Sequence, residues 1–381
     1  MKFLPLVLRN LRRNRRRTIL TVLSIAVSIF VFAALISMPS LIQQILRDRA
    51  NSLRLISFCK AGFFYPLPEA YVGRIQSIPH VEAVAGETIF MGTYRDPKDL
   101  VPSAALDPDH VEDIWGDWKV GRADAEEFRR VKTGALVGPT LLSRFRWKVG
   151  DRVTLRGTVF PVDVELTIVG TLGGTAPPYA LMFRRDYLDE VLGRPGTVNL
   201  IWIKVDSSKW IPSVIADVDE KFANSSAETK TQSELGVSLS QMGAWRPLID
   251  GIEGIALVVI FAIGLVAVNT AAMSIRERRQ ELAVMRAIGF TRPVIVSCLV
   301  SEGLLIGALG GGLGCLAAYL GLKLVPYASE SLGMFAFMLV MSRKVAAESL
   351  LVAILIGLGS SILPASAATR GDVAGSLRAV I

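Results

Sequence analysis

The chain has 381 residues, of which 51% are hydrophobic and 20% are charged, and its formal net charge is +8. It is too apolar for an ordinary soluble protein and too charged for one that lies wholly in a membrane, so we expect a few membrane helices and one sizeable soluble domain. Residues 47–247 have a net charge of −1 and the remainder has +9. This distribution favours contact with anionic membrane lipids and argues against nucleic-acid binding by the soluble domain.

The N-terminal region predicts a membrane anchor. Residues 1–17 hold seven basic residues and no acid, which is typical of a segment at the membrane interface. Thr18–Met38 carries no charge and is long enough to span a bilayer. A cleaved signal peptide is the alternative, although the apolar run is longer than that of a signal peptide and no clear cleavage site follows. We expect an uncleaved first transmembrane helix with its N-terminus inside, continuing as an amphipathic stalk, over residues 18–54.

Residues 55–244 mix strand and helix patterns and predict an α+β domain with one or two cores. The strands are expected at Val81–Met91, Val101–Leu106, Ala135–Val137, Arg152–Arg156, Val162–Leu172 and Val198–Val205. The helices are expected at Pro68–Ser77, Pro139–Phe145, Arg185–Leu192 and Ile211–Phe222, with loops and a helix at Asp107–Arg130 and a turn at Gly173-Gly174.

Three more apolar runs follow, and they complete a fold class of four transmembrane helices with a large extracytoplasmic α+β domain inserted between helices 1 and 2. The spans are expected at 245–275, 293–325 and 345–369, the last interrupted at Pro364. They leave a loop at 276–292, a short loop at 326–344 and a tail at 370–381. The first loop has five basic residues, whereas the second has only Arg343 and Lys344. This bias predicts both termini inside and the large domain outside.

The loop Arg276–Arg292 combines its five basic residues with two acids. Read as a helix, it places Leu282, Met285 and Gly289 near one line. Gly289 is expected to end this helix, because glycine tolerates the left-handed conformation, and Pro293 to open the next. From charge alone, the loop either is gripped by a partner protein or only sets the topology.

The third span carries small residues and one acid. Gly303, Gly307, Gly310, Gly311 and Gly314 have the spacing that lets helices approach closely. They pack either against the chain's own helices or in a dimer seam. Glu302 is costly in a membrane unless it is paired or hydrated, so it has either a functional role or a structural bond to Ser301 or a neighbouring helix.

No catalytic, cofactor-binding or metal site is expected in this chain. There is no G-x-x-x-x-G-K-[ST] motif and not even a Gly-Lys pair, so no phosphate-binding loop is present. The three cysteines and two histidines have no metal-ligand spacing.

The order of these segments resembles the FtsX-like/MacB-type permeases of ABC transporters and their lipoprotein-exporting and DevC-like relatives. The run Ile275–Gly289, with Glu302 after it, looks like the family's inner loop, whose coupling helix docks on the ATPase. Leu136-Val137-Gly138 and Val149-Gly150-Asp151 are similar to the outer core domain. Pro364-Ala365, Ala367-Ala368 and Leu377-Arg378 resemble the C-terminal signature.

The resemblance implies partners. Because seventeen residues precede the first span, we expect a separate ATPase subunit that binds ATP and Mg. Its docking residues are expected to be Arg276, Glu277, Arg278, Arg279, Glu281, Leu282, Met285, Arg286 and Gly289. Arg278 and Arg286 are expected to pair with acids of the ATPase, and Glu281 with a base. A second permease copy or a related permease, a periplasmic adaptor or lipoprotein, and an inner-membrane location are also implied.

The implied function is ATP-driven motion of a periplasmic domain for export or extraction of a lipid, lipoprotein or small hydrophobic molecule. The alternative is FtsX-like signalling, in which the chain activates a periplasmic partner without transport. The size of the outer domain favours the exporters, by analogy of fold alone.

Overall fold

The computed structural model describes residues 15–243, 245–328 and 341–370, in two compact units. One unit comprises Met1–Ile42, Arg246–Val325 and Met338–Ile381, and the other comprises Gln43–Trp245 and Pro326–Phe337. Most of the predicted N-terminal segment, short loop and C-terminal tail falls at 1–14, 329–340 and 371–381, outside the described residues.

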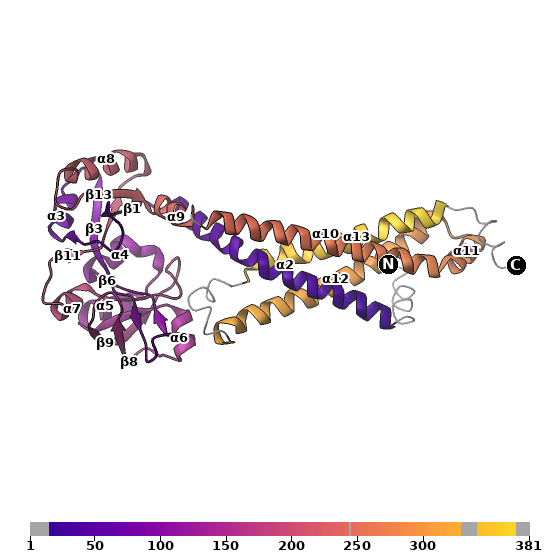
Figure 1. Cartoon of the computed structure of the whole chain (residues 1–381), viewed down its shortest axis with the longest axis horizontal. Coiled ribbons are helices and arrows are strands. Elements are labelled where there is room, and N and C mark those ends of the chain that lie inside the picture. The colour runs from indigo at the N-terminus through magenta and orange to yellow at the C-terminus, as the bar shows by residue number, and fades with distance from the viewer. Residues whose placement is uncertain (1–14, 244, 329–340, 371–381) are drawn as a thin grey trace. The chain divides into compact units, whose positions relative to one another are not determined.

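Four long helices meet the length and hydropathy that a membrane span needs, as the sequence predicts. They are α2 (Arg15–Ala50), α10 (Arg246–Glu277), α12 (Arg292–Ala328) and α13 (Arg343–Arg370), and Figure 1 shows them as the long ribbons. The predicted interruption at Pro364 is wrong, because α13 continues through it. Membrane helices tolerate proline where neighbouring groups satisfy the freed carbonyl.

The second unit is built on a large mixed sheet whose strand order is β13-β1-β12-β3-β6-β10-β7-β9-β8-β4-β5. The strands are β1 (Arg54–Cys59), β3 (Val81–Ile89), β4 (Gly92–Thr93), β5 (Leu100–Val101), β6 (Ser103–Leu106), β7 (Gly134–Val137), β8 (Arg152–Gly157), β9 (Asp163–Thr171), β10 (Leu181–Arg184), β12 (Leu200–Val205) and β13 (Thr229–Ser233). A separate pair joins β2 (Leu67–Pro68) to β11 (Thr197–Val198). In chain order, all of these strands follow α2 and precede α10.

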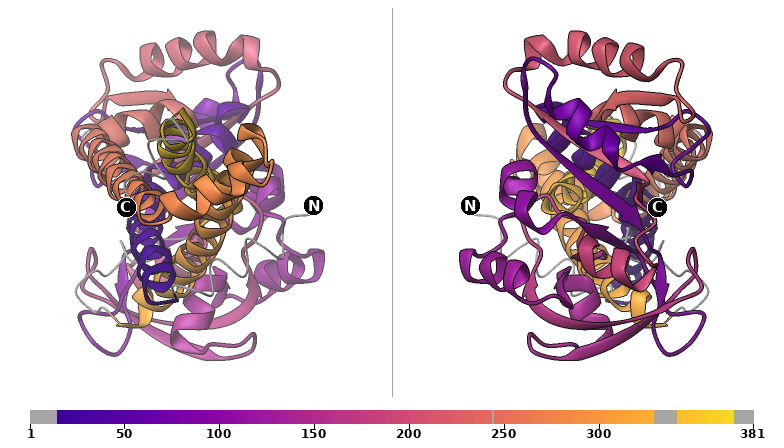
Figure 2. Two further views of the ribbon diagram at one scale, coloured as in Figure 1. Left: turned by 90° about the vertical axis from the view of Figure 1, so that its right-hand side faces the viewer. Right: turned by 90° about the vertical axis from the view of Figure 1, so that its left-hand side faces the viewer.

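Short helices cover the sheet, and Figure 2 shows α8 lying across the strands beneath it. They are α3 (Ala70–Gln76), α4 (Val111–Trp115), α5 (Arg122–Arg130), α6 (Pro139–Phe145), α7 (Arg185–Val191), α8 (Ile211–Phe222) and α9 (Glu234–Gly243), with single turns η1 (Pro108–His110), η2 (Gly116–Trp118) and η3 (Ser208–Trp210). Alternate residues of β3 point to opposite faces. Val84 therefore packs in the cluster around Phe222, and Ala83 and Ala85 pack in the cluster around Trp115.

The strand and helix predictions for this unit are confirmed wherever the sequence pattern is strong. The predicted Pro139–Phe145 and Ile211–Phe222 match α6 and α8. No pattern predicts β1, β10, β13 or α9. The apolar residues before β1 continue the helical spacing of the stalk, and β13 (TKTQS) is polar because it lies at the edge of the sheet.

Glu87 is an acid held among apolar groups near the end of β3. Its carboxylate accepts a hydrogen bond of 2.5 Å from the indole Nε1–H of Trp202 on β12. Burial raises the pKa of Glu87 to about 7, and the bond from Trp202 opposes this rise without cancelling it. The folded chain therefore binds this proton more tightly than the unfolded chain does.

Substitution Glu87→Gln should remove a pH dependence of stability. The pKa of Glu87 is higher in the folded chain, so its contribution to stability is present below about pH 4.5 and is lost as the pH rises through about 7. We expect the variant to be more stable than the wild type at pH 8, by roughly 2 kcal/mol, with a smaller difference at pH 5. Thermal unfolding at both pH values measures this. Exposed Glu165→Gln is the control, and equal behaviour of the two variants would contradict the prediction.

Candidate functional site

The segment between the second and third spans forms a helical hairpin. α10 runs to Glu277, the chain turns at Arg278, and a short helix, α11 (Arg279–Ala287), follows before α12. The helix is therefore shorter than the predicted Arg276–Arg292.

The end of α11 is the one that the sequence predicts. Gly289 has φ +105°, its N–H donates to the Arg286 carbonyl at 3.1 Å, and the Phe290 N–H donates to the Met285 carbonyl at 3.0 Å. These two bonds make a Schellman motif with glycine at the left-handed position. Pro293 lies in the first turn of α12, where its missing N–H costs little.

One side of α11 packs inward. Leu282 and Ala283 are buried, and Leu282 belongs to an apolar cluster with Ile275, Ile295, Leu299 and Ala365 of the neighbouring helices. Met285 packs against the same cluster. Two side chains that the resemblance assigned to docking thus lie against the chain's own helices, where they fix the orientation of α11.

Arg278 ties the turn of the hairpin to the third span. Its guanidinium lies 2.9 Å from the Glu302 carboxylate of α12, and both side chains are 16% exposed. Arg278 also lies 3.5 Å from Glu281, one turn along α11. Glu302 thus has a cationic partner in the turn between α10 and α11, while Ser301 donates to the carbonyl of Ser297 instead. Arg278, expected to pair with a partner's acid, has two partners within the chain.

The opposite side of the hairpin is exposed. Arg276, Arg279 and Gln280 present polar groups, and Val284 and Ile288 are 49% and 74% exposed. Gln280, Val284 and Ile288 are four residues apart and therefore lie along one side of the helix. We call these five residues the outer face of the hairpin. The sequence reasoning missed Val284 and Ile288, although their four-residue spacing was a usable signal.

Two other residues that the resemblance assigned to docking, Glu277 and Arg286, differ in their surroundings. Glu277 accepts from Arg17 of α2 at 2.7 Å, and Arg286 is half-buried. The pair of Arg17 with Glu277 therefore joins the hairpin to α2, and the pair of Arg278 with Glu302 joins it to α12.

Three glycines of the third span lie against α13. A Cβ on Gly303 would overlap the Ser361 hydroxyl, and one on Gly307 would lie 2.6 Å from the Ala353 carbonyl oxygen. Gly311 meets the Ala353 side chain in the same way. Only glycine allows this approach of the two backbones.

The other two glycines lie against α2. A Cβ on Gly310 would lie 2.8 Å from that of Ile25, and one on Gly314 would lie 2.5 Å from the Ala26 carbonyl oxygen. All five glycines thus pack against helices of the chain itself.

A second ion cluster lies within the α+β unit, where β1 begins. The Arg54 side chain donates to Glu234 of α9 at 2.8 Å and to Asp117 of η2 at 2.9 Å. Arg49, in the last turn of α2, lies 3.4 Å from the second oxygen of Glu234. Burial acts to raise the pKa of Asp117, but bonds from Arg54 and Thr175 outweigh it, so this pKa lies below its usual value.

The predicted turn at Gly173-Gly174 packs against Asp117 of this cluster. Gly174 has φ +55°, and a Cβ there would overlap the carbonyl oxygen of Asp117. The cluster therefore joins the end of α2, the start of α9 and the η2 turn, three segments far apart in sequence.

Comparisons with known proteins agree with this architecture. The family description "MacB-like periplasmic core domain" matches residues 18–221, and "FtsX-like permease C-terminal" matches residues 254–373. The chain belongs to the FtsX-like, MacB-type family of ABC transporter permeases. The resemblance inferred from the sequence is thereby confirmed.

Two relatives of the permease carry the same general description. An uncharacterised ABC transporter permease of Methanocaldococcus jannaschii is 22% identical over 396 residues, which cover 97% of this chain and 96% of that protein. An uncharacterised ABC transporter permease protein of Mycobacterium tuberculosis is 25% identical over 305 residues, covering 76% of this chain and 33% of that protein.

Two solved structures resemble the α+β unit of the permease. The periplasmic region of MacB from Actinobacillus actinomycetemcomitans has a TM-score of 0.38 at 10% identity and covers 53% of this chain and 96% of that one. The extracellular domain of YknZ from Gram-positive bacteria has a TM-score of 0.36 at 12% identity, covering 47% and 99%. TM-scores this low do not by themselves establish a shared fold.

Exchanging the charges of Arg278 and Glu302 should restore the stability that is lost when only one of the two charges is reversed. Arg278→Glu or Glu302→Arg alone places two like charges together, and we expect each to lower stability by about 3 kcal/mol. The double variant restores an ion pair and should recover at least half of the loss. Thermal unfolding of the purified permease measures this, with exposed Arg292→Glu as the control. Additive losses in the double variant would show that the pair is not coupled.

Arg54→Ala should destabilise the permease strongly, because it leaves the carboxylates of Glu234 and Asp117 without their main cation. We expect a loss of about 3 kcal/mol, whereas Arg152→Ala, which breaks an exposed pair, should cost less than about 1 kcal/mol. Tryptophan fluorescence during denaturation follows both, since Trp115 and Trp118 flank Asp117 in sequence. Similar losses for the two variants would contradict this role for Arg54.

Proposed function

We propose that this permease is the membrane subunit of an ATP-driven machine, and that the outer face of the hairpin docks a separate ATPase subunit. The observation that carries the proposal is the division of α11 into two sides. Its inner side is fixed by Leu282 and by the ion pair of Arg278, so the helix is held as a rigid body. The outer face offers Arg276 of α10 and Arg279 of α11 beside Val284 and Ile288, a combination suited to an apolar pocket rimmed by acids.

The proposed orientation places the hairpin and both termini in the cytoplasm and the α+β unit in the periplasm, with the chain in the inner membrane. Basic residues support it. Arg15, Arg16 and Arg17 begin α2, and five basic residues lie within Arg276–Arg292, the segment that contains α11. Loops rich in Arg and Lys stay on the cytoplasmic side.

The proposed mechanism is mechanical. Closure of the ATPase, which binds ATP and Mg, displaces α11. The inner packing and the pair of Arg278 with Glu302 pass this displacement to α10 and α12, because buried charges stay together. Chain continuity passes it through α2 and α10 to the α+β unit, where Arg54 joins Glu234 to Asp117. A second permease copy or a related permease completes the complex.

The proposed cargo is a lipid, a lipoprotein or a small hydrophobic molecule, which the moving α+β unit expels or hands to a periplasmic adaptor or lipoprotein. This part rests on the likeness to exporting members of the family. Signalling to a periplasmic enzyme uses the same hairpin and the same ATPase. The periplasmic protein that purifies with the complex therefore distinguishes the two functions.

Ile288→Asp should separate the permease from its ATPase. A charge at the most exposed apolar position of the outer face removes a central contact, and we expect the amount of co-purified ATPase to fall at least about tenfold. The measurement is a pull-down of tagged permease from solubilised native membranes, with quantitative mass spectrometry.

Val149→Asp is the matched control for this pull-down, because Val149 is an exposed valine of the α+β unit. It should leave the ATPase yield unchanged. Wild-type yield with Ile288→Asp, or no ATPase with the unaltered chain, would overturn the docking proposal.

A further inference from the structure

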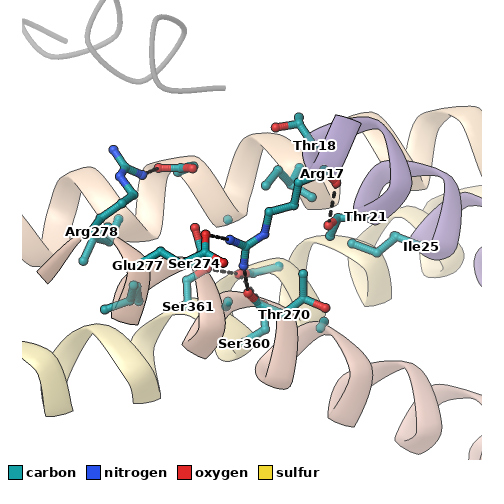
Figure 3. Close-up of a pocket in the computed structure, with 18 residues that line it drawn as sticks. Arg17, Thr18, Thr21, Ile25, Thr270, Ser274, Glu277, Arg278, Ser360 and Ser361 are labelled. Atoms are coloured by element: carbon teal, nitrogen blue, oxygen red, sulfur yellow. Dashed lines mark hydrogen bonds and ion pairs between the residues drawn. The ribbon is translucent and has the colours of Figure 1, made fainter. Parts of the chain in front are cut away.

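A polar cavity opens among the four membrane helices, next to the hairpin. Its volume is about 260 Å³, and Figure 3 shows side chains from α2, α10 and α13 converging on it. Hydroxyl groups dominate much of its wall: Thr18, Thr21, Thr270, Ser274, Ser360 and Ser361. Ile25, Leu299 and Ile306 supply apolar surface. Polar groups lining a cavity within a membrane bundle point to a ligand or a functional site.

Two arginines and two glutamates also line the cavity, so its net charge is zero. Arg17 reaches from α2 to the Glu277 carboxylate at 2.7 Å and also donates to the Thr270 carbonyl oxygen. Arg278 pairs with Glu302 at 2.9 Å.

The two ion pairs differ in exposure. The side chains of Arg278 and Glu302 are both 16% exposed, and this pair is fixed in the helix packing. Arg17 is 21% exposed and Glu277 is 49% exposed. An ion pair that is open to solvent on one side contributes little to stability. Arg17 and Glu277 can therefore separate and each bind a ligand at a small cost in free energy.

We propose that this cavity binds the zwitterionic headgroup of a phospholipid with a primary amine, phosphoethanolamine. The phosphate accepts from the Arg17 guanidinium, whose planar donors suit it, and the ammonium donates to the Glu277 carboxylate. Each member of the exposed pair thus gains a new partner of the right sign. The hydroxyl of Ser274, which also lines the cavity, donates to a remaining phosphate oxygen.

Charge balance selects this class of lipid. A zwitterion leaves the net charge of the cavity at zero, whereas an anionic headgroup adds a negative charge, and both arginines among the described lining residues already have a carboxylate partner. A quaternary ammonium carries the same charge but has no N–H to donate to Glu277. The site should therefore prefer phosphatidylethanolamine over both phosphatidylglycerol and phosphatidylcholine. This inference does not depend on ATPase docking.

The test is native mass spectrometry of the purified full-length permease, with equal amounts of the three lipids added in detergent. We expect phosphatidylethanolamine to bind about tenfold more tightly than either of the others. Arg17→Gln and Glu277→Gln should each abolish this preference. Arg16→Gln should retain it, because Arg16 is an exposed arginine of the same turn and does not line the cavity.

Soluble glycerophosphoethanolamine, a phosphodiester with the same charges as the lipid headgroup, is added as a competitor and identifies the source of the ligand. Partial displacement of the lipid supports recognition through the headgroup. Full displacement of the lipid by an equal concentration of the competitor would indicate that the ligand is a free metabolite, and it would overturn the lipid assignment. Equal binding of the three lipids to the unaltered permease would overturn the proposal, and so would a preference for phosphatidylglycerol. Neither result requires that a variant folds.

Discussion

A charge removed from water requires a fixed partner, and this constraint organises both units of the permease. In the membrane helices, Glu302 is paired with Arg278, so the start of α11 cannot move away from α12 without exposing two charges to a poor solvent. In the α+β unit, Arg54 plays the same part between Glu234 and Asp117. Each pair joins segments that are distant in sequence.

Close backbone packing provides the second constraint. In a bilayer, helices gain little by burying apolar side chains, because lipid is equally apolar, so they associate through tight contacts of small residues. Gly303 and Gly307 bring α12 against α13, and Gly310 and Gly314 bring it against α2. The third span therefore packs closely against both α2 and α13.

Local patterns allowed much of the permease to be predicted. Hydropathy over some twenty residues locates the four spans because a bilayer imposes their length. The end of α11 at Gly289 follows from the chemistry of one residue, and α6 and α8 follow from helical periodicity within one segment. The absence of a phosphate-binding loop and the charged loop between two spans lead to the family without any coordinates.

The sequence by itself therefore determined the four spans, the end of α11 at Gly289, and the strongly patterned helices and strands, all of which depend on local periodicity, hydropathy or turn chemistry. The tertiary structure alone decided which side of α11 faces outward, that Glu302 pairs with Arg278, and that β1 lies between β12 and β13. Arg278 and Glu302 are 24 positions apart, and the paired residues of β1 lie 142 to 178 positions from their partners in β12 and β13. A helical pattern gives the spacing of side chains around an axis, but the neighbouring helices determine which side is buried.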